Sequence, residues 1–227
     1  MIPRPDNPIA LALDESDLDA ADALARELAT QVGVLKVGLE LAWASGPEAV
    51  RRIAAHGPVL VDAKLHDIPT TVERASENIA RLGPGMFTAH ALGGEAMIAA
   101  AVRGAERGAR ASGVRPPMLI AVTVLSSLSG ESLASAASLA FEARAAGAAG
   151  AVVSGDDVAT VREVIGDEFC LIVPGIRPAG SNGHDQVRVL TPQEAIEAGA
   201  DYIVVGRPIT RASDPRSAAA AILAAVR

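Results

Sequence analysis

The chain has 227 residues, of which half are hydrophobic and 21% are charged, and its formal net charge is −7; this composition suits one large folded domain rather than a disordered chain. The negative charge and the five scattered aromatic residues exclude a basic or base-stacking surface, so we expect no nucleic-acid partner. The opening residues MIPRPDNP lack the apolar core of a secretion signal and no apolar run is long enough to span a bilayer, so we expect a cytoplasmic protein without a membrane partner.

Short apolar runs alternate eight times with amphipathic segments. The expected strands are Ile9–Asp14, Val34–Gly38, Val59–Lys64, Met86–His90, Leu119–Leu125, Gly150–Ser154, Cys170–Pro174 and Asp201–Gly206. Their Val, Ile, Leu and Ala content is typical of parallel strands covered on both faces. In the first helical segment, Leu24, Leu28 and Val32 recur every four residues. Strand–helix alternation leaves a closed barrel or an open doubly wound sheet, and eight units without a break in composition favour an α/β fold of the (β/α)8 TIM-barrel type, as a single domain over residues 1–227.

Polar residues gather where the expected strands end. In a barrel, the carboxyl ends of the strands carry the chemistry. The candidates there are Asp14 after the first strand, Lys36 in the second, Asp62 and Lys64 in the third, Ser126 after the fifth, Arg177 after the seventh, and Gly206 and Arg207 after the eighth.

Lysine usage distinguishes two of these positions. All but two of the 20 basic residues are arginine, and both lysines, Lys36 and Lys64, fall inside apolar strands. A compact ammonium can place a point charge against a substrate atom and can donate a proton, which a guanidinium does not readily do. One strand lysine could merely extend to water from the barrel rim. Two lysines beside carboxylates favour a catalytic centre, and Asp62 and Lys64, two residues apart, should both face the barrel interior.

The segment after Lys64 begins a helix. Pro69 suits the first helical turn and holds Ile68 extended. Asp67 could be no more than a helix cap, and the same holds for Thr70 and Thr71.

The loops after the seventh and eighth strands predict a phosphate site. Gly206 would offer backbone N–H groups at a helix start, and Arg207 a charged fork. The loop PAGSNGHDQ, between Arg177 and Gln186, is rich in Gly, Ser and Asn, which indicates mobility. From the residues alone, a solvated loop and a surface arginine remain possible.

The segment DAKLHDIPTT resembles the D-x-K-x-x-D-I-P-x-T signature of the orotidine 5′-phosphate decarboxylase family. The resemblance extends over LALD, LKVGLEL, VTVLSS, VPGIRPAGSNGHDQ and TPQEAIEAGADYIVVGRPIT, and it is closest to the bacterial form. It implies conversion of orotidine 5′-monophosphate to UMP and CO₂ without a metal or organic cofactor. It also implies that Asp62 lies against the departing carboxylate and that Lys64, kept charged by flanking carboxylates, faces C6 of the pyrimidine and protonates it.

The same resemblance assigns the remaining candidates. It implies that Asp14 and Lys36 contact the ribose hydroxyls, and that Ser126, where many members have Thr, contacts the pyrimidine edge. It implies a homodimer in which Asp67, Ile68 and Thr71 complete the neighbouring subunit's site, while His66 is a spectator. The residues implied for the phosphate, under a closing loop, are Arg177, Gln186, Gly206 and Arg207.

Other readings remain open. A sister barrel acting on a keto-sugar phosphate with Mg²⁺ shares the D-x-K-x-x-D core, but such relatives carry an acidic metal ligand where this chain has Lys36. A non-catalytic phosphate-binding barrel would not require Asp62 beside Lys64. The four histidines show no metal-ligand spacing, although His90 could support the barrel rim. Cys170 is expected to be a buried, inert thiol.

Overall fold

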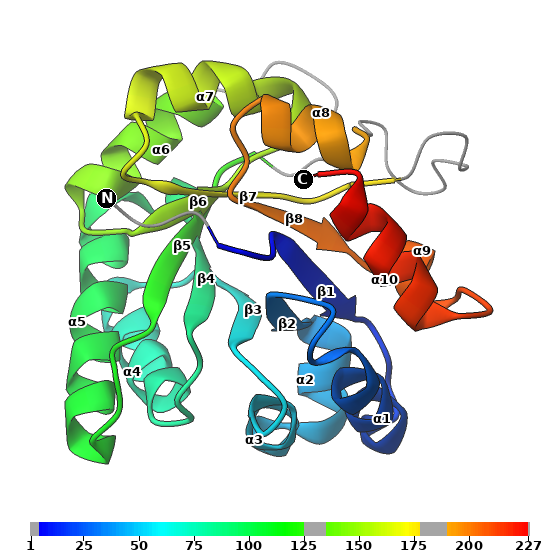
Figure 1. Ribbon diagram of the computed structural model, residues 1–227. Coiled ribbons are helices and arrows are strands. Elements are labelled where there is room, and N and C mark those ends of the chain that lie inside the picture. The colour runs from blue at the N-terminus through cyan, green and yellow to red at the C-terminus, as the bar shows by residue number, and fades with distance from the viewer. Residues whose placement is uncertain (1–4, 125–134, 178–189, 227) are drawn as a thin grey trace.

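The computed structural model describes residues 5–124, 135–177 and 190–226. Eight parallel strands form a closed barrel in which each strand pairs with the next and the last pairs with the first (Figure 1). The strands are β1 (Ile9–Leu13), β2 (Val34–Val37), β3 (Val59–Leu65), β4 (Met86–His90), β5 (Met118–Val122), β6 (Gly150–Val152), β7 (Cys170–Val173) and β8 (Tyr202–Val205). The predicted (β/α)8 barrel is confirmed, and the open sheet is wrong.

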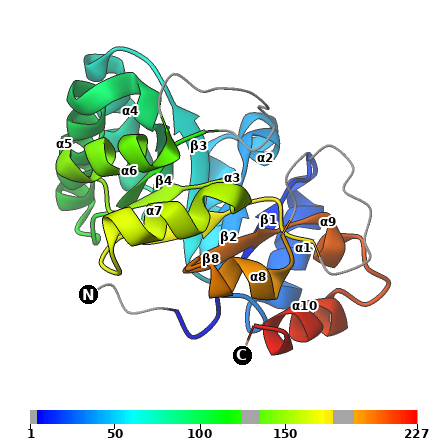
Figure 2. The ribbon, with the colours of Figure 1, turned by 90° about the horizontal axis from the view of Figure 1, so that it is seen from above.

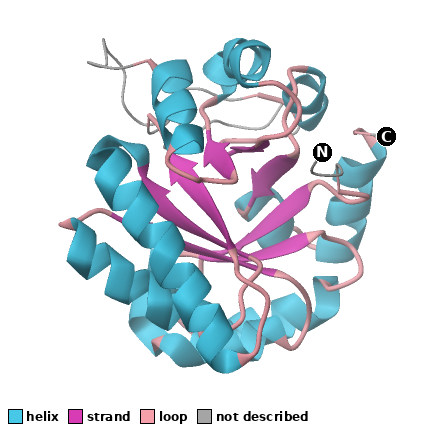
Figure 3. Ribbon diagram, turned by 90° about the vertical axis from the view of Figure 1, so that its left-hand side faces the viewer, coloured by secondary structure: helices cyan, strands magenta, loops and turns pink. Residues whose placement is uncertain are grey.

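Helices surround the barrel, as Figure 3 shows. They are α1 (Leu18–Leu28), α2 (Leu39–Ser45), α3 (Pro47–Ala54), α4 (Pro69–Ala80), α5 (Gly94–Ser112), α6 (Ala136–Ala145), α7 (Val158–Ile165), α8 (Pro192–Glu197), α9 (Arg207–Thr210) and α10 (Pro215–Ala224), with short 3-10 turns η1 (Ala91–Gly93) and η2 (Gly155–Asp157). Seen from above, α4, α5 and α6 lie together on one side (Figure 2). Among the helices of the three described ranges, none combines the length and the apolar character of a membrane span.

Local sequence signals set where several helices begin and end. The Asp17 carboxylate accepts from the backbone N–H of Asp19 at 2.8 Å and so caps α1. Thr191 and Glu194 form a reciprocal capping box at the start of α8. The long helix α5 ends at Gly113, whose φ of 66° suits a residue without a Cβ.

Successive side chains of each strand point alternately outward and inward, and this alternation creates two separate apolar clusters. Odd positions of β1, such as Ile9 and Leu11, pack between the barrel and the helices. The even position Ala10 belongs to a second cluster inside the barrel, with Val34, Leu60, Met86, Ile120, Cys170 and Ile172. Since side chains alternate along a strand, the residues two and four positions further on also point inward, toward the carboxyl ends. The barrel floor is therefore apolar, and polar residues follow above it.

Several strand ends differ from the expected ones. Most strands end one or two residues early, so Asp14 and Gly206 follow β1 and β8 instead of ending them. Pro174 has no N–H for the ladder, which explains the end of β7 at Val173. In contrast, β3 runs one residue further, to Leu65. Leu125, the expected end of the fifth strand, lies outside the described residues.

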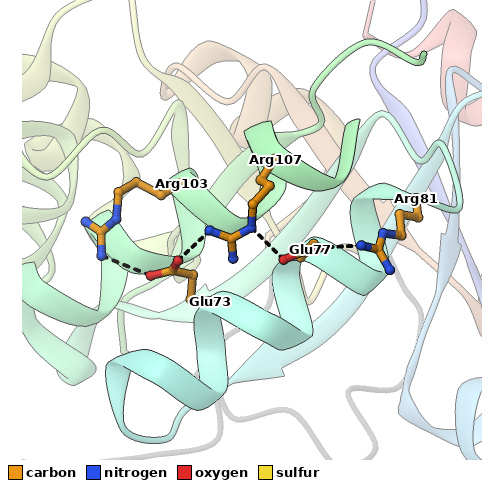
Figure 4. Close-up of polar contacts among 5 residues, drawn as sticks. All are labelled: Glu73, Glu77, Arg81, Arg103 and Arg107. Carbon is orange, nitrogen blue, oxygen red and sulfur yellow. Dashed lines mark hydrogen bonds and ion pairs between the residues drawn. The ribbon is translucent and has the colours of Figure 1, made fainter. Parts of the chain in front are cut away.

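The helix α4, which follows the D-x-K-x-x-D segment, packs unusually close to α5. Gly104 and Gly108 of α5 face the backbone carbonyls of Glu73 and Glu77, so that a Cβ at either glycine would lie 2.0 or 2.1 Å from a carbonyl oxygen. Beside this contact, Arg107 of α5 pairs with both Glu73 at 2.7 Å and Glu77 at 2.6 Å (Figure 4). Arg103 of α5 also pairs with Glu73, and Arg81, the residue after α4, pairs with Glu77. The close approach fixes α4 against its neighbour.

Candidate active site

A cavity of about 290 Å³ opens at the carboxyl ends of the strands. Its apolar wall comes from inward-facing strand residues such as Leu60, Val122 and Ile172. Its polar lining is Asp14, Lys36, Asp62, Lys64, Thr88, Arg177 and Arg207, with backbone at Gly175 and Gly206. Most of the sequence-predicted candidates therefore meet in one place, at the end of the barrel where such enzymes carry their chemistry.

Four charged residues form an alternating row in this cavity. The Lys36 ammonium lies 3.2 Å from Asp14 Oδ1 and 3.5 Å from Asp62 Oδ2. The Lys64 ammonium donates to the same Asp62 oxygen at 2.6 Å. Asp62 and Lys36 are largely buried, with 14% and 10% of their side chains exposed, whereas Asp14 is open at 57%. The inner pairs are thus shielded from water, which strengthens their electrostatic interaction.

A bulge in β3 positions the central pair. Val61 pairs with Phe87 and Leu65 with Ala89, so that residues 62–64 stand opposite Thr88 alone. Lys64 has φ of 48° and is the only non-glycine residue in the described ranges with a positive φ. Such a conformation is unfavourable for a lysine, and bulges of this kind re-aim side chains beside active sites.

Thr88 of β4 connects to both residues and was missed by the sequence-based reasoning. Its hydroxyl accepts from the Lys64 backbone N–H at 2.8 Å and donates to Asp62 Oδ1 at 3.0 Å. The signal for it was present, because Thr88 lies two positions after the inward-facing Met86 and must face the same way.

The environment of Asp62 favours its charged form. Burial alone would raise the pKa of Asp62, but the charges of Lys36 and Lys64 and the hydrogen bonds from Lys64 and Thr88 hold this pKa below its ordinary value. A carboxylate is therefore maintained at a largely buried position.

Glycines leave space around the Asp14–Lys36 pair. A Cβ at Gly38 would lie 3.0 Å from both Asp14 Oδ1 and the Lys36 ammonium, and one at Gly206 would lie 3.3 Å from the Ala12 side chain. The cavity lining also contains Arg177, which is 8% exposed, and Arg207 at the start of α9, and both contribute positive charge. An anion is the ligand that such a wall favours.

Three candidates from the resemblance do not line this chain's own cavity. Asp67, Ile68 and Thr71 are exposed, with Ile68 at 66%. The helix α4 begins at Pro69, as predicted, and Ile68 is extended with ψ of 149°. The Asp67 carboxylate accepts from the adjacent Ile68 N–H and is not the N-cap of α4. The remaining two candidates, Ser126 and Gln186, lie outside the described residues.

Two histidines lie near the cavity without lining it. The rings of His66 and His90 are 5.4 Å apart. Burial, followed by the charges of His66 and Lys64, lowers the pKa of His90. In the described part of the chain no group of three or more His, Cys, Asp or Glu side chains is arranged to hold a metal ion. Cys170 is buried, and burial raises its pKa to about 12, which agrees with an inert thiol.

Residues 7–222 match the model of the orotidine 5′-phosphate decarboxylase / HUMPS family. The chain belongs to this family. Proteins named orotidine 5′-phosphate decarboxylase from Anaeromyxobacter sp. (strain K) and Moorella thermoacetica are 49% and 45% identical to it, over 97% and 96% of this chain and 99% and 91% of theirs. A crystal structure of the decarboxylase from Lactobacillus acidophilus is 36% identical, with a TM-score of 0.83, and covers 97% of this chain and 99% of that one. The resemblance found in the sequence is thus confirmed.

Proposed function

We propose that this protein converts orotidine 5′-monophosphate to UMP and CO₂ in pyrimidine biosynthesis, without a metal or organic cofactor, as one domain over residues 1–227. The observation that carries the proposal is the Lys36–Asp62–Lys64 arrangement in the cavity at the end of the barrel, in a chain of this family. Relatives that share 41–49% of its residues bear the name of this decarboxylase.

Lys64 supplies the chemistry. When the bond between C6 and the carboxyl group breaks, the electron pair stays on C6, and CO₂ departs. A fixed ammonium directed at C6 stabilises this charge most strongly in the transition state, then donates its proton to C6 and becomes an amine that is reprotonated from solvent. Asp62, which bonds that ammonium at 2.6 Å, lies against the departing carboxylate.

The other candidates hold the non-reacting parts of the substrate. Asp14 and Lys36, 3.2 Å apart, bind the ribose hydroxyls. The cationic wall of Arg177 and Arg207, with the backbone at Gly206, binds the phosphate together with Gln186, and Ser126 contacts the pyrimidine edge. Binding energy from the phosphate then helps to assemble the site.

We further propose a homodimer in which Asp67, Ile68 and Thr71 reach the partner's cavity. Large apolar side chains on the segments that follow β2, β3 and β4 support it: Trp43 is 86% exposed, Ile68 66% and Leu92 57%. These strands are neighbours in the barrel, and the three segments follow the carboxyl ends of their strands, the end of the barrel that carries the site. Apolar groups gathered beside a site are typical of an interface.

The alternative function to be distinguished from this one is a Mg²⁺-dependent reaction on a keto-sugar phosphate. The Lys36 ammonium stands between two carboxylates, where it would repel a divalent cation. The test is therefore turnover of orotidine 5′-monophosphate in excess EDTA, followed by ultraviolet absorbance. We expect activity that EDTA leaves unchanged, and a loss of roughly 10³-fold or more in Lys64→Ala.

The control is Arg51→Ala, which removes an exposed cation of α3 outside the cavity and should leave turnover unchanged. Absence of turnover in the folded wild-type protein, or turnover that appears only with added Mg²⁺, would contradict the proposed function.

A further inference from the structure

The hydroxyl of Thr88 stands at the centre of the β3 bulge. Thr88 is fully buried in β4, and its single hydroxyl serves both ends of the bulge. It accepts from the Lys64 backbone N–H at 2.8 Å, and its own hydrogen points to Asp62 Oδ1 at 3.0 Å. A hydroxyl has one hydrogen to donate, so the first bond leaves that hydrogen for the carboxylate.

These two bonds determine how Asp62 presents its oxygens. Oδ2 is bound by the ammonium groups of Lys64 and Lys36, and Oδ1 is bound by Thr88. Partners on both oxygens fix the rotation of the carboxylate plane. Without Thr88, Oδ1 would lose its fixed partner, and the Asp62 side chain could turn about its last torsion.

The same hydroxyl supports the unfavourable backbone at Lys64. A lysine at φ of 48° persists only where surrounding contacts hold it. The bulge leaves the Lys64 N–H without its regular ladder partner, and Thr88 provides the acceptor. Since a buried N–H without an acceptor is costly, the hydroxyl stabilises this backbone as well.

We propose that Thr88 is a positioning residue for the decarboxylation: through its hydroxyl it fixes the orientation of the Asp62 carboxylate and the position of the Lys64 backbone. The catalytic part of this inference rests on the proposed function. Thr88 acts through Asp62 and Lys64 and needs no contact with the substrate's reacting atoms.

The experiment compares three substitutions of similar size. Thr88→Val keeps the shape and removes both hydrogen bonds, whereas Thr88→Ser keeps the hydroxyl. Thr123→Val is the matched control, because Thr123 is also buried and its hydroxyl donates to the Val152 carbonyl at 2.9 Å, outside the cavity lining. If Thr88→Val does not fold, Thr88→Ala is measured in its place.

The first readout is kinetic. We expect Thr88→Val to lower kcat by roughly 10-fold to 100-fold, the range for losing one hydrogen bond to a charged group. KM should stay within about threefold, because the phosphate and ribose contacts do not involve Thr88. Thr88→Ser and Thr123→Val should both keep kcat within about threefold of wild type.

The second readout needs no turnover. In protein labelled with ¹³C at the aspartate carboxyl groups, the Asp62 signal is identified by its loss in Asp62→Asn and is titrated by NMR. We expect a higher pKa for Asp62 in Thr88→Val than in wild type, and an unchanged one in Thr88→Ser and Thr123→Val.

Each outcome decides one point. A wild-type pKa of Asp62 together with wild-type kcat in Thr88→Val overturns the inference, and so does an equal loss of kcat in Thr123→Val. If the Asp62 pKa shifts as expected while the wild-type protein does not decarboxylate orotidine 5′-monophosphate, the proposed function fails and the positioning of Asp62 by Thr88 stands.

Discussion

Lys64 and Asp62 are separated by one residue of β3, and the Lys64 ammonium donates a 2.6 Å hydrogen bond to Asp62 Oδ2. Both side chains line the cavity, and the backbone between them lies in the β3 bulge, where Lys64 has a φ of 48°. Lys36 lies 3.5 Å from the same oxygen, so one carboxylate oxygen holds two ammonium groups. The chain forms this arrangement from its own residues, and little reorganisation is left for the reaction itself.

The first prediction concerns acid stability. Because the folded-state pKa of Asp62 lies below its ordinary value, its ionisation stabilises the fold above the unfolded-state pKa of about 3.9, and this contribution is lost as pH falls through the lower folded-state pKa. The free energy of unfolding of the wild type relative to Asp62→Asn should therefore be constant above about pH 5 and fall below about pH 4.

Urea unfolding of both proteins between about pH 6 and pH 3 measures this difference. The comparison with Asp62→Asn removes the contributions of other carboxylates with lowered pKa values, such as Glu73 and Asp22. A difference that instead increases as pH is lowered through this range would mean that the pKa of Asp62 is raised.

The second prediction concerns the close contact of α4 and α5 (Figure 4). Gly→Ala inside a helix ordinarily stabilises it by about 0.5–1 kcal/mol. Gly104→Ala should do the opposite and lower the free energy of unfolding by about 1–3 kcal/mol, because its Cβ would lie 2.0 Å from the Glu73 carbonyl oxygen. Denaturant unfolding measures the change.

Gly57→Ala is the control, since its Cβ would meet only the Leu35 side chain, at 3.8 Å. It should change stability by less than about 0.5 kcal/mol. Stabilisation by Gly104→Ala would show that α4 can move away from α5 at no cost.

Much of this architecture can be predicted from the sequence, because side chains along a barrel strand alternate between the interior and the surrounding helices. Even-numbered positions of β1 face inward, and the same alternation carries Lys36, Asp62 and Lys64 into one cavity. Thr88 obeys that rule as well, yet it stands in an otherwise apolar run where a threonine is unremarkable. Its importance depends on the bulge, which pairs it with distant residues.

The backbone conformation at Lys64 and the buried face of α1 cannot be predicted from the local sequence. Nothing in the identity of Lys64 indicates a positive φ, which glycine or asparagine would adopt more readily. The expected stripe of Leu24, Leu28 and Val32 does face the core, but α1 ends at Leu28, so Val32 lies beyond the helix. The fully buried residues of α1 are Ala21, Ala25 and Leu28. Which residues of a helix become fully buried is decided by tertiary packing, which the local sequence does not contain.

The third prediction separates stability from activity. Asp201 precedes β8, at the end of the barrel opposite the cavity, and its Oδ2 accepts from Arg162 at 2.7 Å and from the Leu171 N–H at 2.8 Å. Asp201→Ala leaves the mostly buried Arg162 without its carboxylate and should cost about 3–5 kcal/mol.

At a temperature where this variant is folded, its kcat should stay within about threefold of wild type, because the amino ends of barrel strands serve stability. The exposed Asp167→Ala should change stability by less than about 0.5 kcal/mol. A large loss of kcat in fully folded Asp201→Ala would mean that the barrel floor influences the site.

The last prediction tests whether the site is shared between subunits. If Asp67 completes the partner's cavity, Lys64→Ala and Asp67→Ala are each inactive, and a hybrid dimer contains one site with both residues intact. An equimolar mixture after subunit exchange should recover about one quarter of wild-type activity, since half of the dimers are hybrids and each has one working site. Mixing Lys64→Ala with Asp62→Asn is the matched control, because these residues line the same chain's cavity and every site remains defective. No recovery in the first mixture, once exchange is verified by mass spectrometry, would place Asp67 in its own subunit's site, and full activity of Asp67→Ala alone would place it outside the chemistry. Recovery in the control would show that activity can return without any intact site, and would contradict the shared-site explanation of the first mixture.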